Sequence, residues 1–245
     1  MKRLLFNSKK IMGLVALMFT MLTVSCSNEE NEMINFGNED YEILVYAENF
    51  GKLHNECLDY CYDQLNSMKL RSSKNFASEV EFYEKIVEFV NQYTKKEYSS
   101  SDLKNSNVFI SLDLILSVTN EDIRKKMSSL ELSYIDQIFM KEPTDKKAIQ
   151  ELLLKLLTEK DLSNLQKKGV ASFISVYQQS SEYWDERLQD WMNLKKNSIE
   201  QFKMTKVASW VVSDCYWGWF GTVSSGGNAI VGAGAATVAS VCSAL

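Results

Sequence analysis

The chain has 245 residues, of which 45% are hydrophobic and 24% are charged, so it can fold around a sizeable core. Its net charge of −5 argues against nucleic acid as a partner, because phosphate binding needs an excess of Lys and Arg. Proline occurs once, at Pro143, where average usage would give about 12, and this scarcity favours long helices over a fold with many turns.

Residues 1–25 have the layout of a secretory signal peptide. A basic start is followed by an apolar run at positions 11–25, which is too short for a comfortable membrane span. Removal of this segment takes away four positive charges and changes the net charge from −5 to −9. A mature chain this acidic is also a poor partner for anionic lipid headgroups.

The signal segment ends in Leu22-Thr23-Val24-Ser25-Cys26. This stretch resembles the lipobox of bacterial lipoproteins, although Thr23 stands where the family usually has leucine. The resemblance covers the first 26 residues only. It implies that Cys26 is lipidated, becomes the new N-terminus and attaches the chain to a membrane. The alternative is an ordinary signal peptidase cut near Ser25, which also exports the chain.

Residues 26–37 are expected to be a lipidated tether. The stretch at 27–32 is short, polar and acidic, and it resembles the surface-export tag of some Gram-negative lipoproteins. The same composition is typical of a solvated, disordered tether. We therefore expect a lipid-anchored protein of the outer membrane in the cell envelope, with the external face favoured over the periplasmic face.

Residues 38–206 are expected to form an amphipathic helical body. Spacings of three and four place the following residues on one face of a first helix: Phe50, His54, Cys57, Cys61, Leu65 and Met68. A break at 71–74 precedes a second helix from about Phe76, and three serines at 99–101 indicate a loop.

The stretch 108–118 alternates in hydrophobicity as a strand does, but it has no partner strand, so we expect a buried helix. Thr119 is expected to cap a helix that runs to about Met140. Pro143 ends it, and Thr144 is expected to cap the next. Gly169 precedes a last apolar stripe from Phe173 to Phe202. The fold class is therefore all-α, a multi-helix bundle.

Residues 207–245 differ abruptly from the body. They contain a single charged side chain, Asp214, together with six of the ten glycines and three of the five tryptophans. The turn residues at 224–227 divide them into two apolar segments, which we expect to form a Gly/Ala-rich helical hairpin. Small residues recur every four positions in the second segment, an arrangement that lets two helix backbones approach closely: Gly232, Ala236, Ser240 and Ala244.

Two interpretations of this hairpin stay open. In the favoured one it is the buried centre of the bundle, with its small-residue face against the Trp-rich segment. In the other it inserts into a membrane, because no charged side chain occurs from Gly221 onward. Its Gly, Ala, Ser and Thr content gives little insertion energy, although the segment is similar in composition to the hydrophobic ends of some pore-forming bacteriocin-type peptides.

After Cys26, four thiols remain in the exported chain: Cys57, Cys61, Cys215 and Cys242. A disulfide between Cys215 and Cys242 would staple the hairpin, provided that its loop centres near Asn228. Buried thiols that act as small apolar residues are the alternative.

Candidate chemistry is sparse. His54, Cys57 and Cys61 share a helix face and could in principle hold zinc, but the chain has one histidine and no CxxC pair, so we expect core packing and no metal or cofactor. A Ser-His-Asp site would have to use His54, and no serine lies in a nucleophile-elbow context. Four carboxylates lie beside Trp184 and Trp191 on what is expected to be a solvated helix face: Glu182, Asp185, Glu186 and Asp190.

The sequence therefore favours a non-catalytic envelope lipoprotein with a helical binding or scaffold module for an unidentified extracellular or envelope partner. A membrane-active protein that inserts its C-terminal hairpin is the main alternative, and an enzyme with an unrecognised carboxylate site is a third.

Overall fold

The computed structural model describes residues 38–72, 79–97, 110–195 and 209–244. The signal segment, Cys26, the acidic tether, the loop predicted at 99–101 and Phe202 lie outside these residues. The described part belongs to one compact unit with nine helices and no strand. The predicted all-α bundle with a C-terminal helical hairpin is therefore confirmed.

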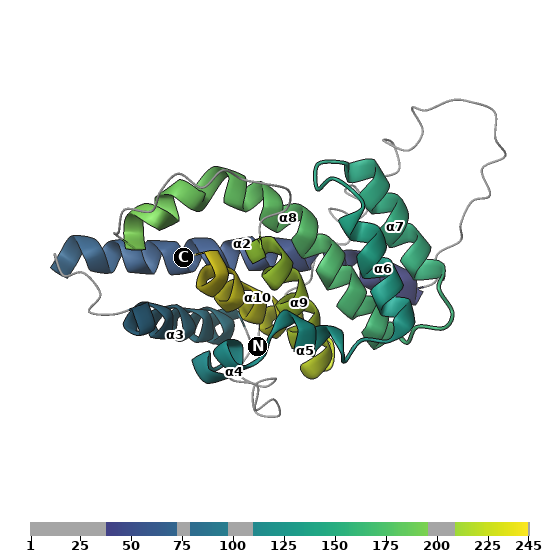
Figure 1. Ribbon diagram of the computed structural model, residues 1–245, viewed down its shortest axis with the longest axis horizontal. Helices are drawn as coiled ribbons and strands as arrows, with labels where there is room; N and C mark the ends of the chain where they lie inside the picture. The colour runs from purple at the N-terminus through teal and green to yellow at the C-terminus, as the bar shows by residue number, and fades with distance from the viewer. Residues whose placement is uncertain (1–37, 73–78, 98–109, 196–208, 245) are drawn as a thin grey trace, which may run out of the picture. The chain divides into compact units, whose positions relative to one another are not determined.

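Two long helices frame the fold: α2 (Asn38–Ser72) and α8 (Asn164–Lys195), which pack against each other. Helices α9 (Ser209–Ser224) and α10 (Ala229–Ala244) form the hairpin. Helix α9 contacts α8, and α10 contacts both α2 and α3 (Glu79–Glu97) (Figure 1). The hairpin is thus surrounded by amphipathic helices.

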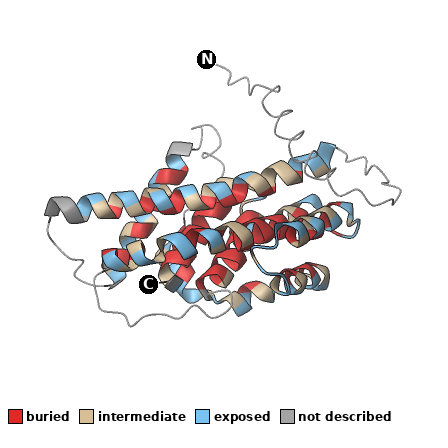
Figure 2. Cartoon of the chain, turned by 90° about the horizontal axis from the view of Figure 1, so that it is seen from above, coloured by how far each residue is buried: buried red, intermediate tan, exposed pale blue. Residues whose placement is uncertain are grey.

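The hairpin is buried along nearly its whole length, as the concentration of buried residues in the centre of Figure 2 shows. Its apolar composition requires this location in water, and its small residues allow close packing. A Cβ atom on Gly221 of α9 would lie 2.8 Å from the Cα atom of Gly232 on α10. The two helices therefore approach almost backbone to backbone at this level. A Cβ on Gly232 would also meet the Phe50 ring of α2 at 2.7 Å.

The turn between α9 and α10 lies where the sequence places it. Gly226 and Gly227 have φ values of 69° and 92°, a region that favours glycine. Asn228 then caps α10, because its side-chain oxygen accepts from the amides of Ile230 and Val231.

The segment from Thr119 to Phe139 is two helices rather than the single one predicted. Thr119 caps α5 (Asn120–Arg124) as expected, but a second capping box, from Ser128 to Glu131, begins α6 (Ser129–Phe139). Helix α7 (Lys146–Thr158) is capped by Asp145 and not by Thr144. These local side-chain caps decide boundaries that hydrophobic periodicity alone cannot place.

The prediction of a buried helix at 108–118 is partly wrong. Its described part contains a six-residue helix, α4 (Leu112–Ser117), whose only buried residue is Ile115. Leu116 is 60% exposed, and residues 108 and 109 lie outside the described ranges. The segment contacts the bundle through α3 and α10. Across the described ranges, none of the helices combines the length and apolarity needed to cross a membrane.

Candidate functional site

Four helices place polar side chains at one point in the centre of the bundle. We call this group the central polar cluster: His54 from α2, Ser180 and Trp184 from α8, Asp214 from α9 and Ser240 from α10. Each of the five is almost completely inaccessible to solvent. Asp214 is the single charged residue of the hairpin and His54 is the only histidine of the chain.

Hydrogen bonds in the cluster converge on one carboxyl oxygen. The hydroxyls of Ser180 and Ser240 both donate to Oδ2 of Asp214, the latter over 2.8 Å. Ser240 in turn accepts from the indole N–H of Trp184 at 2.8 Å. Asp214 is therefore tied to α8 and to its own hairpin partner α10 by neutral donors.

His54 completes the cluster from α2. Its Nε2 atom lies 3.7 Å from Oδ2 of Asp214, and its Nδ1 atom is 3.0 Å from the side-chain oxygen of Asn55. Within the described ranges, Nε2 of His54 and Oδ1 of Asp214 have no hydrogen-bond partner. Buried polar atoms without a hydrogen-bond partner are rare and destabilising, so hydrogen bonding is incomplete at this point of the core.

Burial controls the ionisation of both groups. Loss of solvation raises the pKa of Asp214 from 3.8 to about 8, although the Ser180 and Ser240 hydroxyls lower it in part. Loss of solvation also lowers the pKa of His54 from 6.5 to about 4. At neutral pH the pair therefore holds one proton and no net charge, the state in which such a group can be buried at acceptable cost.

The cluster contains the residue types of a Ser-His-Asp site, but its geometry differs from one. In a nucleophilic triad the histidine takes the serine proton, and the aspartate orients the histidine. Here both serines donate directly to Asp214. No substrate can reach these side chains in this conformation, because all of them are enclosed by the bundle. The arrangement is suited to joining helices rather than to acyl transfer.

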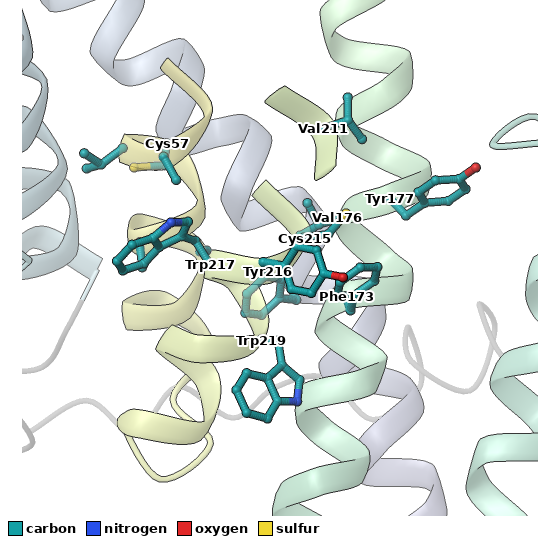
Figure 3. Packing of buried hydrophobic residues seen from close by; sticks show 14 of the residues in the cluster. Cys57, Phe173, Val176, Tyr177, Val211, Cys215, Tyr216, Trp217 and Trp219 are labelled. Atoms are coloured by element: carbon teal, nitrogen blue, oxygen red, sulfur yellow. The ribbon is translucent and has the colours of Figure 1, made fainter. Parts of the chain in front are cut away.

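Cys57 and Cys61 are buried on the same face of α2 as His54, which is the core location expected for them. Figure 3 shows Cys57 and Cys215 among the apolar side chains of the core. Burial and the neighbouring Cys57 thiol raise the pKa of Cys61, so it stays a neutral thiol. In the part of the chain that is described, no group of three His, Cys, Asp or Glu side chains could hold a metal ion.

Of the two alternatives that the sequence leaves open for Cys215 and Cys242, a disulfide or thiols, the structure has thiols. The turn lies at Gly226 and Gly227, so 11 residues separate it from Cys215 and 15 separate it from Cys242. The difference of four residues staggers the two side chains by about 6 Å along the helix axes. Added to the separation between packed helices, this exceeds disulfide reach.

The carboxylates beside Trp184 and Trp191 are on the outside of α8. Glu182, Asp185 and Glu186 are exposed, and Asp190 forms an ion pair with Arg187 at 3.4 Å. Both tryptophans are buried beneath them. These acids therefore form the solvated face of the helix, as expected.

A second buried polar connection was not foreseen from the sequence. Glu131, which caps α6, also accepts from the indole N–H of Trp219 on α9 at 3.0 Å. Gly169 in α8 leaves room for that indole, since a Cβ there would lie 2.8 Å from the Trp219 ring. One carboxylate thus joins the start of α6 to the hairpin.

Available sequence signals pointed to Asp214 and His54 but not to their serine partners. A lone acid in an apolar segment and a lone histidine in an apolar stripe both require polar partners if they are buried. Ser180 and Ser240 are among many serines, and only the packing of α8 against the hairpin selects them. Comparison with protein-family models, curated proteins and solved structures gave no match to this chain.

Proposed function

We propose that the protein is a non-catalytic lipoprotein of the cell envelope, whose helical body binds or scaffolds a partner outside the cytoplasm. Lipid on Cys26 would be the membrane attachment, and residues 27–37 would be the tether between lipid and body. The observation that carries this proposal is the position of the apolar hairpin, which is the buried centre of the body.

Burial of the hairpin supports the proposal because it accounts for the apolar segment without a membrane. Trp210, Trp217 and Trp219 are each less than 10% exposed, and α10 packs against α2, α3 and α9. A segment already covered on these sides gains little from a bilayer, and its Gly and Ala content adds little insertion energy.

The enzyme alternative has one specific point in its favour, a carboxyl group with a strongly raised pKa at Asp214. That group lacks a route for substrate, and its partners hold it within the packing of the four helices. Its environment is explained by the joining of α2, α8, α9 and α10.

Two measurements test the proposal. Metabolic labelling with a palmitate analogue should mark the wild type and leave Cys26→Ser unlabelled, and the variant should move from the envelope fraction to the soluble fraction. Equal labelling of both would exclude Cys26 as the anchor.

The second measurement is liposome flotation of residues 27–245, which lack the lipid-bearing cysteine. We expect a monodisperse helical protein in the aqueous fraction. Flotation with release of a trapped dye would instead favour the membrane-active alternative, in which the hairpin α9–α10 inserts into a bilayer. If the protein stays in the aqueous fraction, the next experiment is to identify its partner, for example by crosslinking on intact cells.

A further inference from the structure

In the central polar cluster, buried polar side chains from α2, α8, α9 and α10 meet at one point. Through Asp214 and Ser240 it holds both arms of the hairpin, and through Ser180 and His54 it reaches the two long helices that cover them. All of these contacts meet at a single carboxyl oxygen, so a change at that carboxyl acts on the whole junction.

We propose that His54 and Asp214 form a proton-dependent clasp, which secures the hairpin against α2 and α8 while the pair holds one proton and loosens it when that proton is lost. The geometry motivates the proposal. Nε2 of His54 and Oδ2 of Asp214 face each other at 3.7 Å with no solvent contact, and neither Nε2 nor the second carboxyl oxygen, Oδ1, has a hydrogen-bond partner among the described residues. An extra or a missing proton therefore leaves an uncompensated charge in the core.

Titratable groups around the pair are few. Only His54 titrates among the side chains that contact Asp214 from α2, α8 and α10, and on α9 the neighbouring Cys215 has its pKa raised well above the usual value by burial. Charged and phenolic groups on the other packed elements pair elsewhere: Arg124 of α5 with Tyr216, Tyr93 of α3 with Glu56, Lys146 of α7 with Glu182, and Tyr183 of α8 with Asp59.

Counting protons gives the direction of the effect. In the unfolded chain Asp214 and His54 titrate near 3.8 and 6.5, whereas in the fold they titrate near 8 and 4. From pH 4 to 6.5 each state binds one proton, on His54 when unfolded and on Asp214 when folded. The pair therefore does not make stability change with pH in this range. From pH 6.5 to 8 only the folded state binds a proton, and the raised pKa of Asp214 makes stability fall with rising pH.

The size of the effect follows from the same count. One proton bound only in the folded state changes the unfolding equilibrium constant tenfold per pH unit. From the plateau below pH 6 to the plateau above pH 9 the constant should rise about 30-fold in total, and about 10-fold of this rise falls between pH 6.5 and 8.5 because Asp214 and the unfolded His54 are each only partly titrated at those limits. Cys61 and Cys215 have little influence in most of this window, because their ordinary pKa of 9.0 in the unfolded chain lies above it, and their influence at its upper end is the same in the wild type and in an Asp214 variant.

Asp214→Asn is the informative variant. Its side-chain oxygen can accept from Ser180 and Ser240 in place of Oδ2, so the hydrogen bonds to α8 and α10 are kept without a titrating group. Urea unfolding at pH 6.5 and 8.5 should show about a 10-fold rise of the unfolding constant in the wild type and a change of at most about twofold in this variant. Asp185→Asn, the same replacement on the exposed face of α8, should behave as the wild type does. A wild type insensitive to pH in this range, or an equal response in Asp214→Asn, would overturn the proposal.

Hydrogen exchange locates the loosening. After correction for base catalysis, amides of α9 and α10 in the wild type should lose about 10-fold protection between pH 6.5 and 8.5, and those of the Asp214→Asn hairpin should not. Unchanged protection of the wild-type hairpin would contradict a clasp.

His54 also gives a readout that needs no variant. Because it is the only histidine, selectively labelled protein has one imidazole signal. We expect this signal to stay that of a neutral ring from pH 5 to 9 and to shift once near pH 8, as Asp214 loses its proton. A single titration near pH 6.5 with no step near 8 would refute the proposal even if Asp214→Asn failed to fold.

Discussion

Replacement of Gly221 by alanine tests how closely the two hairpin helices pack. The added Cβ atom would lie 2.8 Å from the Cα atom of Gly232 and 3.0 Å from the Cβ atom of Ala235. Backbone cannot yield as a flexible side chain can, so α9 and α10 would have to separate. Overpacking of this kind costs about 1–3 kcal/mol, and loss of the close contact along the hairpin places Gly221→Ala toward the upper end.

Gly218→Ala is the matched control, since it makes the same change one turn earlier in α9. There the nearest atom is Cε1 of the Phe50 ring at 3.3 Å, and a ring can move by a few tenths of an ångström. Both variants gain about 1 kcal/mol of helix propensity, so Gly218→Ala should be neutral or slightly stabilising.

The assay for both variants is urea unfolding followed by circular dichroism. We expect Gly221→Ala to be less stable than the wild type by about 1–2 kcal/mol after the propensity gain, and less stable than Gly218→Ala. A Gly221→Ala protein at least as stable as Gly218→Ala would refute the close approach of the two helices.

Three further predictions concern other contacts of the body. Glu131→Ala should lower the free energy of unfolding by about 2–3 kcal/mol in urea, because it removes the cap of α6 and leaves the buried Trp219 N–H unpaired. Glu131→Gln should cost less than half as much. Equal losses in the two variants would contradict the hydrogen-bond explanation. Lys167→Met should cost about 1 kcal/mol by the same assay, because Nζ of Lys167 donates to the Leu157 carbonyl at the end of α7. The same replacement at the exposed Lys147 should be neutral. Equal stabilities of the two variants would count against this cap. Maleimide labelling of folded residues 27–245 should modify the half-buried Cys242 first, and rapid labelling of a second thiol would contradict the burial of the other three: Cys57, Cys61 and Cys215.

Fold class and the outline of the hairpin could be predicted because they depend on strong local signals. Helical periodicity and the glycine turn can be read from short stretches of sequence, and proline scarcity from the composition. The structure has helices and a turn at Gly226 and Gly227, as these signals indicate. The core location of the Cys57 face follows from the same periodicity, since its neighbours one turn away are apolar.

Helix boundaries were harder to predict because they depend on single hydrogen bonds. Ser128 divides what looks like one helix, since its hydroxyl and the Glu131 carboxylate satisfy each other's backbone amides. The stretch around α4 is apolar but lies at the edge of the bundle, so Leu114 and Leu116 are exposed despite their type. Composition cannot distinguish an apolar segment at the edge from one in the centre.

The central polar cluster was the least predictable feature, because its members come from four helices and are up to 186 residues apart in the chain. Asp214 and His54 could be identified as unusual within their own segments, but their proximity depends on α10 packing against α2 while α9 packs against α8. Likewise, the stagger that keeps Cys215 from Cys242 depends on where the turn glycines lie.

Removal of the hairpin is the most direct test of the claim that it is the core of the body. A chain that ends at residue 206 loses α9 and α10, which contact α2, α3, α5 and α8. Far-UV circular dichroism with thermal unfolding should then show reduced helix content and no cooperative transition. A cooperative transition with the helix content expected for residues 38–206 would contradict the account, because the body would then fold without its proposed centre.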